Sequence, residues 1–337
     1  MSEILSEVRG QIGIITINRP QALNALNTPM CEAITDALIK WRHDNNIKAV
    51  IIKSDETGRA FCAGGDVIMM SESGKAGDKR AETFWRTEYA LNELIKTYQK
   101  PYIALIDGIT MGGGVGLSVH GKYRIAGDKT LFAMPETGIG YFPDVGGTYF
   151  LPRLGTAIGN WMGLCGARLD GAMALKIGVA THFVKSENYA ILLDALVENP
   201  GDIENTILQF ATIPTCDDLP VEINLFAQES LEKIFNALEN SKSDWAKTQL
   251  KILKTKSLFA LNFTFAAMKI GMISDFKTAM NNELNWSLSF LSTPDFHEGI
   301  RAQLIDKDRN PQWMKNFTQD DVTRIIEKTD KVLEFIK

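Results

Sequence analysis

The hydrophobic positions of the first two hundred residues fall into short β-type runs separated by stretches with helical spacing. One such stretch, residues 28–46, predicts a helix with Thr28 as its N-cap and Pro29 at the first helical position. This alternation is typical of repeated β-α units and predicts an α/β fold. The β-type runs are QIGIITIN (11–18), AVIIKS (49–54), YIALIDG (102–108) and KYRIAGD (122–128).

The pattern changes at Pro200 and Gly201, where the β-type alternation ends and long amphipathic stretches begin. We therefore predict two units, a catalytic core over residues 1–200 and a mostly helical domain over residues 201–337. Within the second unit, SLFALNFTFAAMKIGM (257–272) is rich in Phe and Leu and predicts a buried helix.

Composition and charge exclude several function classes. The 337 residues carry a formal charge of −5, with 45% hydrophobic and 23% charged residues. A broad cationic surface for nucleic acid or membrane lipid is therefore not expected, and any phosphate must be bound locally. No apolar run reaches the roughly 20 residues of a membrane helix, and the acidic N-terminal stretch does not resemble a signal peptide.

Cysteines and histidines give no sign of a metal centre. The four cysteines share no C-x-x-C spacing, which favours a reducing compartment, and we predict a cytoplasmic protein. The four histidines show no spacing typical of metal ligands. We therefore expect neither a metal nor a separate cofactor.

Glycine clusters follow two of the predicted strands. ITMGGGVGLSVHG (109–121) follows YIALIDG, and AFCAGGDV (60–67) follows AVIIKS. Each glycine disfavours a helix by about 1 kcal/mol, so the first cluster needs a reason. One reading is close packing of a helix start against a sheet. The other is a pair of loops whose bare amides polarise a carbonyl and stabilise an oxyanion.

Two carboxylates interrupt the apolar stretch 131–154. Burial of a carboxylate is costly unless the group is paired or used. Asp144 also fits the simpler role of a helix N-cap, in the sequence PDVGGT. Glu136 has no equally ready structural role, and beside two glycine loops it points to acyl chemistry with a Glu base or nucleophile.

Taken together, these segments resemble the crotonase, or enoyl-CoA hydratase/isomerase, superfamily and, within it, the 3-hydroxyisobutyryl-CoA hydrolase branch. The resemblance implies a crotonase-type β/β/α spiral core with an appended, mostly α-helical C-terminal domain. It also implies an acyl-CoA substrate, of which coenzyme A is a part. The matching segments are INRPQALNALN (17–27), AFCAGGDV (60–67), GITMGGGVGLSVHG (108–121), MPETGIGYFPDVGGTYFLPRL (134–154) and PDFHEGIRAQLIDKDRNPQW (294–313).

The resemblance also implies residue roles. The oxyanion hole would be the backbone N–H groups of Gly65 and Gly113, the latter strengthened by the dipole of the helix it begins. Glu136 would be the catalytic carboxylate and Asp144 would orient the 3-hydroxyl of the substrate. Glu88 would contact the substrate, although a solvated Glu is the default on an amphipathic helix. The CoA moiety would be bordered by Gln21, Ala22, Leu23, Asp66 and Val67.

One departure favours hydrolysis. Enoyl-CoA hydratases carry a second glutamate where this chain has Gly116, and without it the addition of water to a double bond loses its acid/base pair. The leading expectation is hydrolysis of 3-hydroxyisobutyryl-CoA, as in valine breakdown. The alternatives are an enoyl-CoA hydratase or isomerase and a non-catalytic CoA-binding protein. Residues 256–269 lack the Ser-Pro and basic character of the hydrolase branch, which leaves the preferred acyl chain undecided. The sequence also allows assembly into a homo-oligomer.

Overall fold

The computed structural model describes residues 2–55 and 58–336 and contains two sheets. The first has the order β1-β2-β3-β5-β7-β10, antiparallel between β1 and β2 and parallel elsewhere. The second has the order β4-β6-β8-β9, antiparallel only between β8 and β9. The strands are β1 (Ile4–Arg9), β2 (Ile12–Ile17), β3 (Ala49–Ser54), β4 (Ala60–Cys62), β5 (Tyr102–Leu105), β6 (Ile109–Met111), β7 (Tyr123–Ala126), β8 (Leu131–Ala133), β9 (Leu169–Asp170) and β10 (His182–Phe183).

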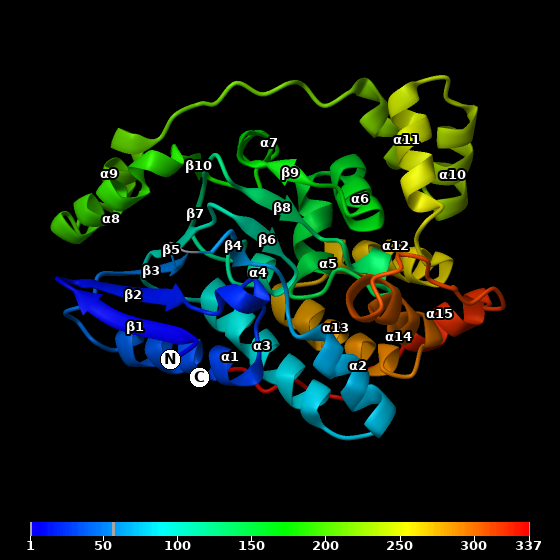
Figure 1. Cartoon of the computed structure of the whole chain (residues 1–337), viewed down its shortest axis with the longest axis horizontal. Coiled ribbons are helices and arrows are strands. Elements are labelled where there is room, and N and C mark those ends of the chain that lie inside the picture. Colours follow the sequence, from blue (N-terminus) through cyan, green and yellow to red (C-terminus); the bar gives the residue numbers. More distant parts are fainter. Residues whose placement is uncertain (1, 56–57, 337) are drawn as a thin grey trace.

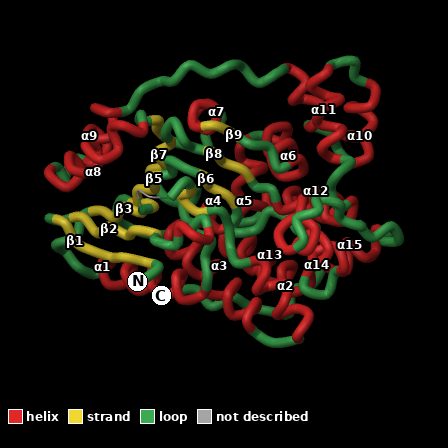
Figure 2. Tube along the Cα trace, in the orientation of Figure 1, coloured by secondary structure: helices red, strands yellow, loops and turns green. Residues whose placement is uncertain are grey.

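Helices cover both sheets and make up the chain beyond β10 (Figure 2). They are α1 (Thr28–Arg42), α2 (Val67–Ala76), α3 (Arg80–Lys96), α4 (Gly113–Gly116), α5 (Gly147–Phe150), α6 (Thr156–Cys165), α7 (Gly171–Lys176), α8 (Tyr189–Glu198), α9 (Ile203–Phe210), α10 (Leu231–Asn240), α11 (Asp244–Leu253), α12 (Leu258–Ile273), α13 (Phe276–Phe290), α14 (Pro294–Ile300) and α15 (Gln319–Ile326). Shorter helical turns are η1 (Pro20–Ala22), η2 (Glu136–Ile139), η3 (Leu151–Leu154), η4 (Ser186–Asn188), η5 (Val221–Phe226) and the π-helical η6 (Arg301–Ile305).

The central strands β2, β3 and β5 of the first sheet are buried on both faces, which explains why they are almost continuously apolar, whereas the edge strand β1 exposes four of its six residues. In β2, Ile12 and Ile14 point into a small core closed by α8 and α9, whereas Ile15 and Ile17 point into the main core. The main core continues from this sheet into the C-terminal helices. The α/β class predicted from the sequence is therefore correct.

Helix α1 begins one residue away from the predicted cap. Asn27 is the N-cap, and its side chain accepts a hydrogen bond from the amide of Met30 at 2.9 Å. Thr28 is the first helical residue and Pro29 follows it. Asn caps a helix at least as well as Thr, so neighbouring capping residues cannot be separated by propensity alone.

Beyond residue 200 the described chain contains helices and no strand. Helix α9 still packs with α8 on the first sheet, and an extended segment, 211–220, then crosses the molecule to α10 and α11 (Figure 1). The predicted buried helix is confirmed as α12, which packs against α5, while α13 packs against α3. The division into two domains at residue 200 stays a prediction.

Candidate active site

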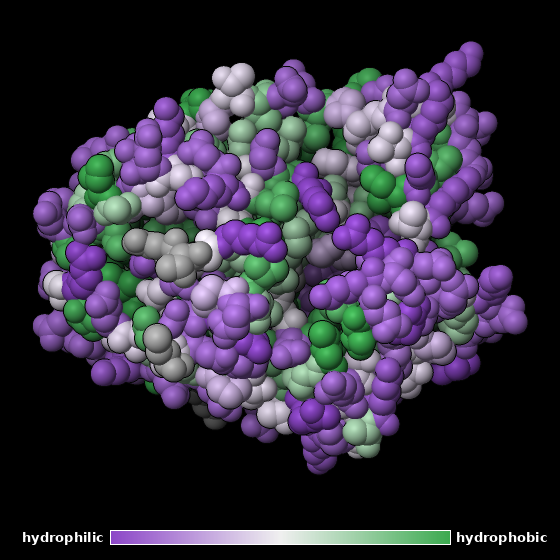
Figure 3. Space-filling view, in the orientation of Figure 1, coloured by the Kyte–Doolittle hydropathy of each residue, from purple (hydrophilic) through white to green (hydrophobic). Residues whose placement is uncertain are grey.

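A pocket of about 970 Å³ lies where the two glycine loops meet the C-terminal helices. Figure 3 shows this face hollowed near its centre, with hydrophilic residues along the rim. The pocket is lined by the loop after β4, the loop after β6, the turn η2, the residues before α12 and the segment around η6. It therefore combines elements from both ends of the chain.

The two glycine loops touch backbone to backbone. A Cβ atom added at Gly113 would lie 3.2 Å from the carbonyl carbon of Gly64, and one added at Gly114 would lie 2.1 Å from the carbonyl oxygen of Cys62. Gly112 also has a φ of +46°, which favours glycine. The sequence allowed two interpretations of this glycine cluster, close packing and amides available to an oxyanion. Close packing does not exclude the second interpretation, because both would use the same loops.

The amides of Gly65 and Gly113 both border the pocket, and neither donates a backbone hydrogen bond within the described chain. A free N–H that faces a pocket is available to an anion or a polarised carbonyl. Helix α4 does begin at Gly113, but it has only four residues. The expected dipole contribution is therefore small, because a macrodipole is the sum over a longer run of peptides.

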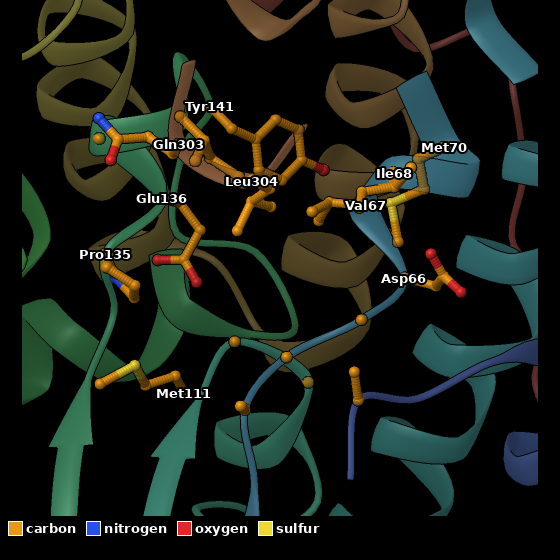
Figure 4. Close-up of a pocket in the computed structure, with 18 of the residues that line it drawn as sticks. Asp66, Val67, Ile68, Met70, Met111, Pro135, Glu136, Tyr141, Gln303 and Leu304 are labelled. Carbon is orange, nitrogen blue, oxygen red and sulfur yellow. The ribbon is translucent and has the colours of Figure 1, made fainter. Parts of the chain in front are cut away.

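Glu136 follows β8 and Pro135 and opens the turn η2. Its side chain is buried, and Oε2 has no hydrogen-bond partner among the described residues. Oε1 lies 3.2 Å from the position of a Cβ atom at Gly112, so the carboxyl lies directly against the glycine loop after β6. Figure 4 shows this carboxyl pointing into the open space of the pocket, with Tyr141 and Leu304 nearby.

The surroundings of Glu136 raise its pKa well above the usual range. Burial is the main cause, and the neighbouring Asp144 adds to it, whereas the ammonium of Lys256 opposes it. Lys256 precedes α12, and its Nζ lies 3.0 Å from the position of a Cβ atom at Gly138. A carboxylate in such a site is a stronger base and nucleophile than one in water.

Glu88, on α3, is buried rather than solvated. Its Oε1 lacks a partner within the described residues and lies 2.7 Å from the position of a Cβ atom at Gly113. Burial, followed by the charges of Asp144 and Glu283, raises its pKa well above the usual range. The sequence default of a solvated Glu is therefore wrong, and Glu88 faces the same loop as Glu136.

Asp144 is buried between η2 and α5 and does not cap a helix, since the N-cap of α5 is Gly146. Its Oδ2 accepts hydrogen bonds from the hydroxyls of Tyr89 at 2.7 Å and Tyr141 at 3.3 Å. Burial raises its pKa to about 6, against the lowering effect of the Tyr89 hydroxyl. The simpler reading of Asp144 as a helix cap is thus not realised.

The loop after Asp144 is strained and held from two sides. Val145 has a φ of +52°, a conformation that costs a β-branched residue about 1–3 kcal/mol. His120 donates from Nε2 to the Val145 carbonyl at 2.7 Å, with a pKa lowered by burial to about 3. Glu283 of α13 accepts from the amides of Gly146 at 2.6 Å and Thr148 at 3.1 Å.

Sequence reasoning missed the residues that hold Asp144 from the C-terminal side. Glu283 and Ser287 lie four positions apart on the amphipathic helix α13, so they share a face, and both are buried. That pair of polar residues on a buried face was the available signal. Tyr141, which follows the C-cap Gly140 of η2, gave no signal of its own.

A family model described as enoyl-CoA hydratase/isomerase matches residues 12–329 of the chain. The chain belongs to the enoyl-CoA hydratase/isomerase family. Its crotonase-type core with C-terminal helices confirms the predicted fold class. It is 33% identical, at a TM-score of 0.93 and 99% coverage of both chains, to a solved structure described as a carnitinyl-CoA dehydratase from Mycobacterium thermoresistibile.

Within this family, similarity extends to proteins with a more specific name. The chain is 45% identical to the mitochondrial 3-hydroxyisobutyryl-CoA hydrolase of Xenopus tropicalis, over 92% of this chain and 84% of the relative. It is 42% identical to the protein of the same name from Homo sapiens, over 95% and 87% of the two chains. A structure described as an enoyl-CoA hydratase from Rhodobacter sphaeroides 2.4.1 is 35% identical, with a TM-score of 0.85 and coverage of 97% and 98%.

The position that separates hydratases from this chain is sterically closed. A Cβ atom at Gly116 would lie 2.8 Å from Nδ2 of Asn92 and 2.8 Å from Cβ of Val145. Asn92 itself is fully buried, and its amide atoms lack partners among the described residues. A glutamate at position 116 would therefore require Asn92 and the loop after Asp144 to move.

Most residues that the resemblance expects to border CoA lie on one edge of the pocket, and their contact with CoA stays a prediction. Ala22, Leu23, Asp66 and Val67 line the pocket, whereas Gln21 is exposed and lies outside it. The Asp66 side chain caps α2, accepting from the amide of Met69 at 3.2 Å, so its backbone faces the pocket edge. The cations that line the pocket were not predicted: Arg19, Arg168, Lys254, Lys256 and Arg309.

Neither a metal site nor a membrane-spanning helix is present among the described residues. No three of their His, Cys, Asp and Glu side chains are arranged to hold a metal ion. None of their helices combines the length and apolar character needed to cross a bilayer. Cys62, beside the glycine loop after β4, is buried. Burial raises the pKa of its thiol to about 12, which fits a structural thiol better than a nucleophile.

Proposed function

We propose that this protein hydrolyses the thioester of a 3-hydroxyacyl-CoA, foremost 3-hydroxyisobutyryl-CoA, to 3-hydroxyisobutyrate and free CoA, as in valine breakdown. The supporting observation is the buried Glu136 carboxyl, with one oxygen unpaired among the described residues, directly against the glycine loop whose Gly113 amide donates no backbone hydrogen bond within the described chain. The names of the similar hydrolases support the same choice of substrate. CoA is part of the substrate, and the proposal includes neither a metal nor a separate cofactor.

The chemistry follows from two donors and one carboxylate. The thioester oxygen would accept hydrogen bonds from the amides of Gly65 and Gly113, which stabilise the charge that develops on it. In one path the Glu136 carboxylate attacks the carbonyl carbon, the C–S bond breaks, and the CoA thiolate takes a proton from solvent. Water then opens the mixed anhydride, which releases the acid and a proton and restores the carboxylate. In the other path Glu136 takes a proton from a water molecule as that water attacks the carbonyl carbon, and the proton passes to the CoA sulfur as the C–S bond breaks. Both paths yield the same products.

Two further carboxyls would recognise the acyl group of the substrate. Asp144, with a pKa of about 6, is largely ionised at neutral pH and would accept a hydrogen bond from the 3-hydroxyl. Glu88, whose pKa is raised above the usual range by burial and then by the charges of Asp144 and Glu283, would contact the acyl group. A site that pairs a substrate hydroxyl in this way rejects analogues that lack it.

The CoA moiety would follow the pocket edge formed by Ala22, Leu23 and the backbone of Asp66 and Val67. Gln21 would contact only the outermost part of the ligand, because it lies outside the pocket. The cations lining the pocket, such as Arg168 and Lys254, supply the local positive charge for phosphates that the acidic chain as a whole lacks.

A hydratase or dehydratase activity is the second candidate, because two similar solved structures carry such descriptions. The closed position at Gly116 argues against it. A non-catalytic CoA-binding protein is the third candidate, and the buried acids in the pocket argue against that reading, because they would destabilise a pocket without chemistry.

Thiol release from a panel of acyl-CoA esters tests the proposal. We expect rapid release of CoA from 3-hydroxyisobutyryl-CoA, slower release from isobutyryl-CoA, and no loss of the enoyl absorbance of crotonyl-CoA. Loss of that absorbance without thiol release would establish the hydratase instead. Tight binding of CoA without any turnover would establish the binding protein.

The cellular location and assembly of the protein stay proposals. The sequence favours a cytoplasmic protein, whereas the similar hydrolases are named mitochondrial. Fractionation of the source cells would locate the protein, and sedimentation of the purified chain would show whether it forms a homo-oligomer.

A further inference from the structure

Three buried hydroxyl groups form a closed cluster around one oxygen of Asp144. Tyr89 of α3 donates to Oδ2 at 2.7 Å, and Tyr141 lies 3.3 Å from the same oxygen. Ser287 of α13 connects the two, with its Oγ 2.7 Å from the Tyr89 hydroxyl and 2.6 Å from the Tyr141 hydroxyl. The cluster therefore joins α3, the segment after η2, and the C-terminal helix α13.

The direction of these hydrogen bonds is fixed by their partners. Ser287 donates to the backbone carbonyl of Glu283 at 2.6 Å, so its oxygen acts as an acceptor toward the tyrosines. Burial raises the pKa of both tyrosines well above the usual range, so they keep their protons. The Tyr89 proton goes to Asp144, and the single Tyr141 proton is shared between Ser287 at 2.6 Å and Asp144 at 3.3 Å, so the 2.7 Å contact between the Tyr89 and Ser287 oxygens has no proton of its own.

We propose that Tyr89, supported by Ser287 and Tyr141, positions Asp144 and keeps it ionised, so that the enzyme selects acyl groups bearing a 3-hydroxyl. This inference rests on the proposed function. Oδ2 is occupied by the hydroxyl cluster, and no other side chain among the described residues donates to Oδ1. The ionised Oδ1 therefore accepts from the substrate hydroxyl, and a protonated Asp144 would lose this preference.

The charges around Asp144 show why the hydroxyls matter. Glu88 faces it from α3, Glu136 from η2 and Glu283 from α13, and the charge of Asp144 raises the pKa of each. His120, which holds the next residue of the loop, is neutral because burial lowers its pKa to about 3. The ammonium of Lys256 acts on Glu136. The Tyr89 hydroxyl is the group that most favours the ionised form of Asp144, followed by the backbone amide of Asp144 and the Tyr141 hydroxyl.

Tyr89→Phe tests this inference, with Ser287→Ala as a second variant. Tyr98→Phe is the matched control, because that half-buried hydroxyl donates to the Leu38 carbonyl at 2.8 Å and does not line the pocket. The measurement is kcat/KM from pH 5 to 9 for 3-hydroxyisobutyryl-CoA and isobutyryl-CoA. Circular dichroism and thermal melting establish that each variant is folded.

For Tyr89→Phe we expect a fall of at least about 10-fold at pH 7 with the hydroxylated ester, because a hydrogen bond to a charged group is lost. The fall in kcat/KM should be smaller with isobutyryl-CoA, so the preference for 3-hydroxyisobutyryl-CoA over isobutyryl-CoA should decrease. The acidic limb for the hydroxylated ester should move up by about one pH unit, because the charged form of Asp144 loses a donor. Ser287→Ala should act in the same direction but less, and Tyr98→Phe should change neither quantity.

Two results would overturn the inference in different ways. If the unmodified protein releases no thiol from either ester, the proposed function fails and this inference fails with it. If the unmodified protein is active but folded Tyr89→Phe slows both esters equally with an unshifted pH profile, the cluster is only structural. Should Tyr89→Phe fail to fold, the same two readouts on Ser287→Ala and Tyr141→Phe decide the question.

Discussion

The glycine loops and the acid cluster, which comprises Glu88, Glu136, Asp144 and Glu283, lie side by side but are built differently. The first three of these acids line the pocket with the loops, and Glu283 lies behind them, fully buried. The loops present the amides of Gly65 and Gly113, each in the turn that follows a strand of the second sheet. The acids come from α3, η2, the segment before α5, and α13. The amides are placed by the backbone path alone, whereas each carboxyl depends on partners from distant parts of the chain.

This difference sets what each region tolerates. In the loops, the tightest positions exclude a Cβ atom, so their function depends on the absence of side chains. In the acid cluster, burial raises the pKa of every member, and the charge of Asp144 raises the pKa of the other three acids. A change of charge there should therefore alter catalysis and pH dependence more than it alters the fold.

The largest effect is expected for Glu136→Gln. The substitution keeps volume while removing basicity and nucleophilicity, so kcat should fall by at least about 10²-fold. The dissociation constant of a CoA ligand should change little, which isothermal titration would check. Glu72→Gln, on the exposed side of α2, is the control and should leave kcat unchanged. A Glu136→Gln enzyme within a few-fold of the unmodified rate would remove Glu136 from the mechanism.

Gly114→Ala should damage the loops through the backbone. Its Cβ would lie 2.1 Å from the Cys62 carbonyl oxygen, and overpacking of this kind costs about 1–3 kcal/mol. Urea unfolding would measure this loss, and we expect kcat to fall with it because the Gly113 amide is displaced. Gly201→Ala is the control, since no atom lies within 4 Å of its added Cβ. Equal stability of the two variants would contradict the close contact between the loops.

Asp144→Asn should change specificity more than rate. Asn keeps the shape but not the charge, so the preference for 3-hydroxyisobutyryl-CoA over isobutyryl-CoA should narrow by about 10-fold or more. Paired kcat/KM values would measure it. If kcat/KM changes little and the preference between the two esters is unchanged, the role of Asp144 is purely structural.

Glu283→Gln should make stability less dependent on pH. Burial raises the pKa of Glu283 to about 8, so this residue favours the folded state below about pH 4 and loses that contribution as pH rises toward 8. The slope is at most about 1.4 kcal/mol per pH unit for one proton. Urea unfolding at pH 5, 6.5 and 8 should therefore show a shallower decline for the variant. Parallel curves would mean that Glu283 titrates normally.

The smallest effect is expected from chelation. Exhaustive treatment with EDTA should leave thiol release unchanged, because amides rather than a metal polarise the carbonyl in this account. Loss of activity that zinc or magnesium restores would refute the role given to Gly65 and Gly113.

The sequence allowed much of the loop side to be predicted and less of the acid cluster. Glycine clusters after strands mark candidate backbone sites locally, and the family resemblance named Gly65 and Gly113 within them. Glu136 was identified as an acid in an apolar stretch. Glu283 and Ser287 could not be assigned to the site, because only the packing of α13 against α3 brings them to Asp144.

Lys256 illustrates the same limit. The sequence showed that residues 256–269 depart from the hydrolase branch, and it left the consequence open. In the structure Lys256, the first residue of this stretch, places its half-buried ammonium at the pocket, where it partly offsets the effect of burial on the pKa of Glu136. The effect depends on the position of α12 relative to η2, which no local pattern encodes.

The most direct test of the central claim is a crystal structure of Glu136→Gln with 3-hydroxyisobutyryl-CoA bound. The account predicts the thioester oxygen within about 3.1 Å of the amide nitrogens of both Gly65 and Gly113. It also predicts the carbonyl carbon facing the side chain at position 136 and the 3-hydroxyl on Oδ1 of Asp144. A thioester oxygen bound away from both amides, or a 3-hydroxyl that faces away from Asp144, would contradict it.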